Sequence, residues 1–155
     1  MNIRNFSVKI FALFIVIVSL ASCSKDDDST DQETINQIED RVESGTWRIT
    51  KFIDSGDDET SNFSGYNFTF NSSGTLNANN GSNDYNGTWS VTDSNSSDDD
   101  DSFDDLDFNI SFNLTNNFED LNDDWDILSH TSTKIELKDV SGGNGGTDYL
   151  TFEKN

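Results

Sequence analysis

The densest group of side chains able to bind an ion is a run of acidic residues between positions 98 and 105. Carboxylates are hard oxygen ligands, and calcium sites of millimolar affinity are typical of extracellular domains. The run lacks the alternating acids and the glycine of an EF-hand loop, and consecutive aspartates repel one another and usually stay solvated. We therefore predict weak, diffuse cation association and no defined metal site. The weak calcium candidates are Asp98, Asp99, Asp100, Asp101, Asp104 and Asp105.

Side chains for covalent or acid–base catalysis are scarce. Cys23 is the one cysteine and His130 the one histidine, and lipid attachment to Cys23, expected from the residues that precede it, would remove it from any Cys–His pair. No Gly-x-Ser-x-Gly turn is present to carry a catalytic serine. Two carboxylates could hydrolyse a glycoside, but no pair stands out among 30 Asp and Glu. We interpret His130 as a strand-end or turn residue and predict no enzyme and no cofactor.

Cys23 follows a segment with the features of an export signal. Arg4 and Lys9 supply positive charge, and residues 10–20 form an apolar run without a charged residue. The run has roughly half of the ~20 residues that span a bilayer, so we expect no permanent transmembrane helix here. We predict that residues 1–22 are a signal peptide that is cleaved.

The residues around the cysteine are Leu20-Ala21-Ser22-Cys23. They resemble the bacterial lipobox, in which small residues precede the acylated cysteine. The resemblance implies cleavage before Cys23 and attachment of lipid, including palmitate, to Cys23. The alternative is a secretory signal followed by a free thiol, which would leave an unpaired cysteine open to oxidation.

The stretch after the cysteine combines one lysine with several acids. It resembles a signal by which one group of Gram-negative bacteria moves lipoproteins to the cell surface. A solvated linker is the alternative, because acidic runs are commonly solvated. We expect residues 23–30 to be a tether, and the protein to be anchored in the outer membrane by the lipid on Cys23 and exposed at the cell surface. The signal residues are Ser24, Lys25, Asp26, Asp27 and Asp28.

The charge of the chain disfavours one class of partner. With 9 Lys and Arg against 30 Asp and Glu, the formal charge is -21. Removal of residues 1–22 leaves 7 Lys and Arg and makes the charge -23, since Arg4 and Lys9 are lost and no acid is. So acidic a surface disfavours nucleic acid and anionic lipid headgroups. The 12 Phe, 3 Trp and 3 Tyr nevertheless indicate one folded domain after the tether.

The first expected element is a short helix over residues 31–44. Thr30 and Glu33 have capping-box spacing, and Ile35, Ile38 and Val42 follow at helical intervals.

From residue 45 onward apolar and polar residues alternate, as in strands with one buried face. In the first strand Trp47, Ile49 and Lys51 are predicted to share a face. Eight such strands follow one another without a helical crossover, so we predict an all-β domain over residues 45–155, an eight-stranded antiparallel meander barrel. A β-sandwich is the alternative. The residues predicted to face the interior are Trp47, Ile49, Phe68, Phe70, Leu76, Trp89, Val91, Phe108, Ile110, Phe112, Trp125, Ile127, Ile135, Leu137, Leu150 and Phe152.

Several short motifs recur in order along these strands. The first, Gly45-Thr46-Trp47, resembles the Gly-x-Trp signature that opens the first strand of lipocalins. The set resembles lipocalin-like lipoproteins of surface-displaying bacteria, and this resemblance implies a lipocalin-like barrel over about residues 45–153. The chain lacks the lipocalin disulfide and shows no clear helix after the barrel. The other motifs are Phe68-Thr69-Phe70, Gly74-Thr75-Leu76, Gly87-Thr88-Trp89 and Leu150-Thr151-Phe152.

The predicted interior residues are large. An eight-stranded barrel is just wide enough to be filled by side chains or to hold one small ligand, so we predict a small or absent central cavity. We therefore expect a non-enzymatic binding or interaction module with a protein or glycan partner at the cell surface. Exposed aromatic loop residues such as Phe63 or Phe118 would support partner binding. A carrier of a small apolar ligand and a structural envelope component are the alternatives, and the sequence does not distinguish a monomer from an oligomer.

Overall fold

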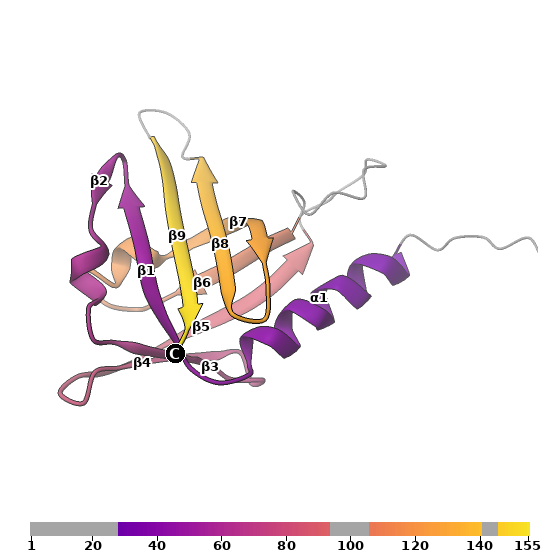
Figure 1. The fold of residues 1–155 in the computed structure, drawn as a ribbon, viewed down its shortest axis with the longest axis horizontal. Coiled ribbons are helices and arrows are strands. Elements are labelled where there is room, and N and C mark those ends of the chain that lie inside the picture. The colour runs from indigo at the N-terminus through magenta and orange to yellow at the C-terminus, as the bar shows by residue number, and fades with distance from the viewer. Residues whose placement is uncertain (1–27, 94–105, 141–145) are drawn as a thin grey trace, which may run out of the picture.

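The structure, a computed structural model, describes residues 28–93, 106–140 and 146–155 (Figure 1). Within these residues one α-helix precedes a series of strands, and two short 3-10 helices, η1 and η3, lie in the connections. In chain order the elements are α1 (Asp28–Val42), β1 (Trp47–Asp54), β2 (Asp57–Asp58), η1 (Thr60–Phe63), β3 (Asn67–Phe70), β4 (Thr75–Asn79), β5 (Asp84–Asp93), β6 (Leu106–Ser111), η3 (Glu119–Leu121), β7 (Asp123–His130), β8 (Lys134–Val140) and β9 (Thr147–Lys154).

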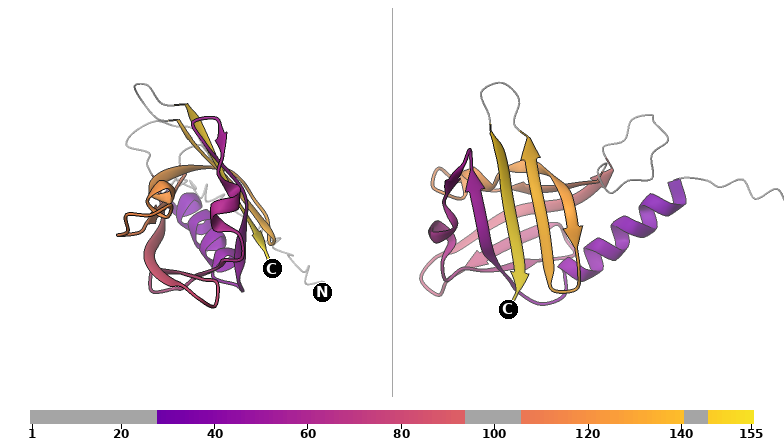
Figure 2. Two further views of the ribbon diagram at one scale, coloured as in Figure 1. Left: turned by 90° about the vertical axis from the view of Figure 1, so that its left-hand side faces the viewer. Right: turned by 45° about the horizontal axis from the view of Figure 1, so that its top comes forward.

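The eight longer strands form one closed antiparallel barrel. From β3 to β9 each strand pairs with the next in the chain, and β1 pairs with both β3 and β9, which closes the ring. The two-residue strand β2 is added to β1 alone. Seen from one end, the strands surround a common axis (Figure 2, left). The predicted eight-stranded antiparallel barrel after a short helix is confirmed, and the β-sandwich alternative is wrong because β1 and β9 join the strands into a single closed sheet.

Burial along the strands follows the alternation of the sequence. In β5, for example, the buried Trp89 and Val91 alternate with the exposed Thr88, Ser90 and Thr92. Side chains of successive strand residues point to opposite faces, so one face of each strand lines the interior. Every residue predicted to face the interior is buried, with at most 7% of its surface exposed.

A β-bulge in β1 changes the phase of that alternation. The pairing of β1 with β9 shifts between Ile49 and Lys51, and beyond the shift Phe52 is buried while Lys51 is exposed. The prediction that Lys51 shares the face of Trp47 is therefore wrong. A bulge places one extra residue in the strand, and this turns the following side chains to the opposite face.

Helix α1 (Asp28–Val42) begins and ends earlier than expected. Residues 28–30, expected to belong to the tether, are helical, and residues 43 and 44 lie outside the helix. The sequence offers several residue types that favour a helix start between Asp28 and Asp31, so the capping-box spacing alone does not select one of them.

One end of the barrel is covered by α1 (Figures 1 and 2). Ile38 and Val42, one turn apart, are completely buried. The indole Nε1 of Trp47 donates a hydrogen bond of 2.8 Å to the carbonyl oxygen of Val42 and so ties the end of the helix to the start of β1. Burial of the two apolar side chains holds α1 against the barrel.

The other end is covered by η1 and by the segment that leads into η3. Phe63 and Phe118 lie there with ring centroids 5.4 Å apart in an edge-to-face contact, and Phe63 makes a similar contact with Phe52. Phe63 is 1% and Phe118 3% exposed. The exposed aromatic rings that would have supported partner binding are therefore not found at these two positions, because both rings pack into the end of the barrel, where burial of their apolar surface is favourable.

Candidate functional site

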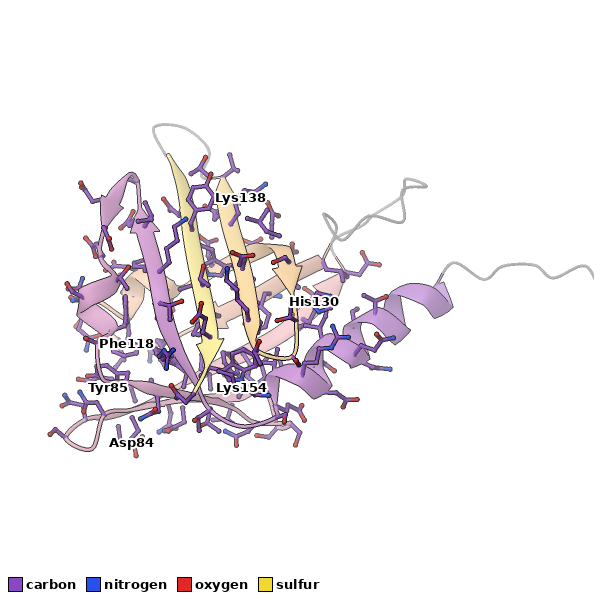
Figure 3. All side chains as sticks on the ribbon, viewed as in Figure 1. Asp84, Tyr85, Phe118, His130, Lys138 and Lys154 are labelled. Atoms are coloured by element: carbon purple, nitrogen blue, oxygen red, sulfur yellow. The ribbon has the colours of Figure 1, made fainter. Side chains whose placement is uncertain are left out.

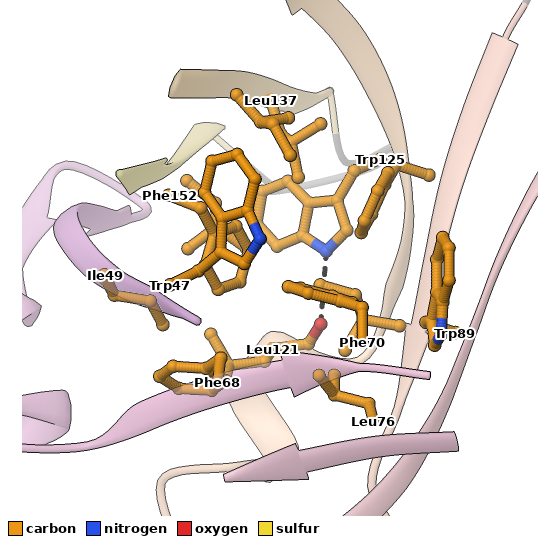
Figure 4. Packing of buried hydrophobic residues seen from close by; sticks show 14 of the residues in the cluster. Trp47, Ile49, Phe68, Phe70, Leu76, Trp89, Leu121, Trp125, Leu137 and Phe152 are labelled. Atoms are coloured by element: carbon orange, nitrogen blue, oxygen red, sulfur yellow. Dashed lines mark hydrogen bonds between the residues drawn. The ribbon is translucent and has the colours of Figure 1, made fainter. Parts of the chain in front are cut away.

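The interior of the barrel is occupied by the chain's own side chains (Figure 4). Phe70 makes edge-to-face contacts with Trp89, Phe108 and Phe152 at centroid distances of 5.4 to 5.6 Å. The indole of Trp125 donates a hydrogen bond of 3.1 Å to the carbonyl oxygen of Leu121. Small-molecule sites combine apolar walls with a few convergent polar groups, whereas the core cluster of the described residues is made of aliphatic and aromatic side chains.

Aspartates gather at the end of the barrel that η1 and η3 cover. We call this group the acidic rim: Asp54, Asp120, Asp123, Asp139 and Asp148. The four from strands occupy positions in phase with buried neighbours. Asp148 accepts a hydrogen bond of 2.6 Å from the backbone N–H of Ser55.

The rim carboxyls perturb one another. Burial raises the pKa of Asp123 to about 6, and a side-chain interaction with Asp124 and the negative charge of Asp139 add to the rise, against a lowering by the backbone N–H of Asp124. Burial also raises the pKa of Asp120, with the charges of Asp54 and Glu119 adding to the effect. A negative ligand group that approached the interior from this end would meet like charge.

His130, at the end of β7, meets α1. Its Nδ1 lies 2.6 Å from Nη1 of Arg41. Since arginine only donates, Nδ1 acts as the acceptor, and the ring is neutral with its proton on Nε2. Burial and the charge of Arg41 lower the pKa of His130. The prediction that His130 is a strand-end residue is confirmed, and its contact joins the helix to the barrel.

A shallow hollow of about 360 Å³ lies on the outer face of β5 and β6. Thr88, Ser90, Asn109 and Ser111 contribute hydroxyl and amide groups to its lining. The Asn109 amide donates a hydrogen bond of 2.8 Å to Oγ1 of Thr92. The hollow can hydrogen-bond a small polar molecule, and Asp123 of β7 adds a carboxyl group to its lining.

The outer face of β8, β9 and β1 is the second surface of distinct character. It carries four of the six Lys and Arg in the described residues, and the tyrosine of β9 lies among them. We call this surface the cationic face: Arg48, Lys51, Lys134, Lys138 and Tyr149.

Strand register sets the arrangement of the cationic face. One cross-strand row contains Arg48 and Lys134 on either side of Glu153, and the next contains Lys51 and Glu136 on either side of Thr151. In the third row Tyr149 lies between Ile53 and Lys138. Figure 3 looks onto this face, with Lys138 toward the upper end of β8 and Lys154 at the lower end of β9.

Most of the site residues predicted from the sequence lie outside the described residues. Asp28 is described, as the first residue of α1. The described residues contain no group of three or more acidic, histidine or cysteine side chains arranged to hold a metal ion, and no described helix is long and apolar enough to cross a membrane. The predicted site residues outside the described ranges are Cys23, Ser24, Lys25, Asp26, Asp27, Asp98, Asp99, Asp100, Asp101, Asp104 and Asp105.

Sequence reasoning missed the cationic face, although the chain carried a signal for it. Lys134, Glu136 and Lys138 alternate with the buried Ile135 and Leu137, so their outward direction follows from period two. The neighbouring positions of Arg48 and Lys51 depend on closure of the barrel through β1 and β9 and on the bulge in β1, which local patterns do not encode.

Comparison with known proteins gives a distant structural likeness. No protein-family model and no curated protein matches the chain. Among solved structures, the chain is similar to a DUF4847 family protein from Bacteroides vulgatus, with 19% sequence identity and a TM-score of 0.46. The match covers 76% of this chain and 97% of the other. A likeness at this level does not identify a function.

Proposed function

We propose that this protein is a bacterial outer-membrane lipoprotein, anchored through Cys23 and exposed at the cell surface. Its barrel acts as a non-enzymatic binding module that uses the outer surface of the strands. The lipobox-like residues before Cys23 and the acidic stretch after it support the anchor. The packed interior supports the use of the outer surface.

The observation that carries the binding mode is the occupied interior. Rings from several strands interlock across the barrel, for example Phe68 and Phe70 with Phe152 at centroid distances of 5.4 Å. A ligand could enter only by displacing such rings, and interiors packed to this extent lose contact energy when side chains move apart. The acidic rim adds repulsion for anionic amphiphiles such as fatty acids.

The alternative of an apolar-ligand carrier is disfavoured by the same packing. A carrier needs a cavity that buries most of its ligand, while the interior positions of this barrel hold large aromatic and aliphatic residues. If the outer surface binds nothing, the alternative of a structural envelope component is favoured.

Thermal unfolding of residues 24–155 distinguishes a ligand site inside the barrel from one on its outer surface. This fragment should fold without the anchor, because every residue of the core cluster lies within residues 38–152. A ligand that binds the folded state raises its stability by mass action. We expect no shift of the melting temperature with fatty acids or sterol-like compounds; a dose-dependent rise with either class would contradict the proposal. Calcium and neutral sugars complete the panel.

The anchor is tested in the full chain. Cells expressing it should incorporate a labelled fatty acid into the protein, and Cys23→Ser should abolish that incorporation. Protease added to intact cells should degrade the anchored protein. Labelling that survives Cys23→Ser would refute attachment at this residue, and complete protection from protease in intact cells would refute surface exposure.

A further inference from the structure

We propose that the outer face of β4, β5 and β6 binds a neutral glycan through hydroxyl and amide side chains. This inference rests on the proposed function, since it names the ligand class of the outer surface and the strands that bind it.

The outward positions along these three strands carry a run of uncharged polar side chains, which we call the hydroxyl–amide face. Asparagine is among the residues that strands disfavour, so strand formation does not account for three asparagines here. Strand β5 lies opposite β9 in the ring of eight strands, and the flank around β9 carries charged side chains of both signs. The face consists of Thr75 and Asn77 of β4, Asn86, Thr88 and Ser90 of β5, and Asn109 and Ser111 of β6.

The hollow of about 360 Å³ lies within this face. Thr88 pairs with Ser111, and Ser90 pairs with Asn109, so four polar side chains surround it. Neighbouring strands are about 5 Å apart, and alternate residues of one strand are about 7 Å apart. The four groups therefore mark out an area comparable with one sugar ring and its hydroxyls. The remaining lining residues are Trp89, Ile110, Asn122 and Asp123.

Several groups of the face can bond a ligand without first losing a partner. Within the described residues, the hydroxyls of Thr88, Ser90 and Ser111 make no side-chain hydrogen bond. The Asn109 amide donates to Oγ1 of Thr92, and its Oδ1 is left to accept. A hydroxyl both donates and accepts, and an amide supplies one group of each kind. Sugar hydroxyls also donate and accept, so the two sets of groups match.

The surroundings of the face disfavour an anionic ligand. None of the six Lys and Arg of the described residues is paired with a residue of the face, and like charge repels an anion. A carboxylate can accept a hydrogen bond from a sugar hydroxyl, whereas an ammonium ligand only donates and would leave the donors of the face unused. The charged residues beside the face are the acids Asp84, Asp107, Asp123 and Asp124.

A protein partner fits the face less well than a glycan does. Protein interfaces are enriched in aromatic residues, Met and Arg and are depleted of Ser, and their binding energy is concentrated in a few buried anchors. The face offers short hydroxyl and amide side chains instead. The exposed large hydrophobic residues of the described chain, Leu128 and Val140, lie on β7 and β8.

Calorimetric titration of residues 24–155 with four neutral polysaccharides, dextran, mannan, galactan and laminarin, tests the proposal. We expect at least one of them to bind. The affinity should change less than about twofold between about 0.1 M and about 1 M salt, because salt screens charges and the ligand has none.

Variants locate the binding on the face. Ser90→Ala combined with Asn109→Ala should weaken binding about fivefold or more, since two bonding groups are lost. Thr88→Val keeps the side-chain shape and removes one hydroxyl, and it should weaken binding about threefold. Ser129→Ala is the matched control, because this exposed serine of β7 lies outside the face and bonds Glu136 at 2.6 Å. It should change binding less than about twofold.

Three outcomes would overturn the proposal. They are absence of binding to all four polysaccharides, binding that is lost at about 1 M salt, which would indicate charged groups, and equal weakening by the Thr88→Val and Ser129→Ala variants. Each variant is also melted, so that misfolding is recognised. The proposed function fails separately, through stabilisation of the fold by an apolar ligand.

Discussion

The single histidine reports on the junction between α1 and the barrel. His130 accepts from Arg41 only while its ring is neutral. Its pKa is lowered by burial and by Arg41, so the unfolded chain binds this proton more tightly than the folded one. The stability that the neutral ring contributes is therefore fully present above about pH 6.5 and is lost as the pH falls through the lowered pKa.

We predict an NMR titration of His130 with a pKa below about 6.5. The chain has one histidine, so its ring signal is unambiguous. Arg41→Gln should move this pKa upward, because it removes a neighbouring positive charge. The exposed Gln37 on the same helix offers Gln37→Ala as a control that leaves the pKa unchanged. A wild-type pKa at or above the ordinary value would contradict the Arg41 contact.

The contribution of Asp123 to stability depends on pH in the opposite direction to that of His130. Its pKa, raised to about 6, lies above that of an unfolded aspartate, so its contribution to stability is present at low pH and is lost as the pH rises through about 6. We predict that Asp123→Asn stabilises the fold at pH 7 by about 1 kcal/mol, a figure reduced for solvent screening at a half-buried carboxyl. The gain should vanish near pH 4.

Denaturant unfolding at the two pH values measures this gain. Asp124→Asn removes the same charge from the exposed neighbour and should have a smaller effect. An Asp123→Asn variant less stable than the wild type at pH 7 would show that this carboxylate is favourably paired.

At the scale of elements, the sequence predicted the strands but not the β-bulge that determines which face the later side chains of β1 occupy. The alternation of Phe68, Phe70, Trp89 and Val91 was sufficient to place them inside. The bulge that exposes Lys51 was not predictable, because it depends on the pairing of β1 with β9 at the far end of the chain. The same non-local pairing creates the cationic face, which explains why the sequence pointed to an acidic surface only.

Helix α1 depends on one buried side chain more than on its exposed residues. Ile38 is completely buried against the barrel. Its truncation leaves a cavity, so we predict that Ile38→Ala lowers the free energy of unfolding by about 2–5 kcal/mol. Gln37→Ala, on the exposed face of the same helix, should cost less than about 0.5 kcal/mol. Equal effects of the two substitutions in denaturant unfolding would mean that α1 does not dock as described.

Gly87 allows β5 to approach β6. A Cβ at this position would lie 2.5 Å from the carbonyl oxygen of Ser111 and 2.8 Å from the ring of Phe112. We predict that Gly87→Ala destabilises the fold by about 1–3 kcal/mol, since the strand must shift to relieve the overlap. Ser90→Ala, at an exposed position of the same strand, is the comparison in thermal melts, and a neutral Gly87→Ala would contradict the close packing of these strands.

At the scale of the whole molecule, the barrel separates an apolar interior from a charged exterior of two signs. The interior is interlocked and covered at both ends, by α1 and by the rings of Phe63 and Phe118. The outer surface of this strongly acidic chain gathers four of the six Lys and Arg of the described residues on one flank, where acids of the neighbouring positions accompany them. This arrangement supports the proposal that a ligand binds to the exterior and not within the core.

Tryptophan fluorescence measures this central claim most directly. Trp47, Trp89 and Trp125 are 0%, 5% and 1% exposed and lie in the interior cluster, so a ligand that entered the barrel would contact at least one indole. We predict that titration of residues 24–155 with fatty acids and sterol-like compounds causes no saturable change in emission. A saturable change with one ligand bound per chain would contradict the account and would make the protein a carrier.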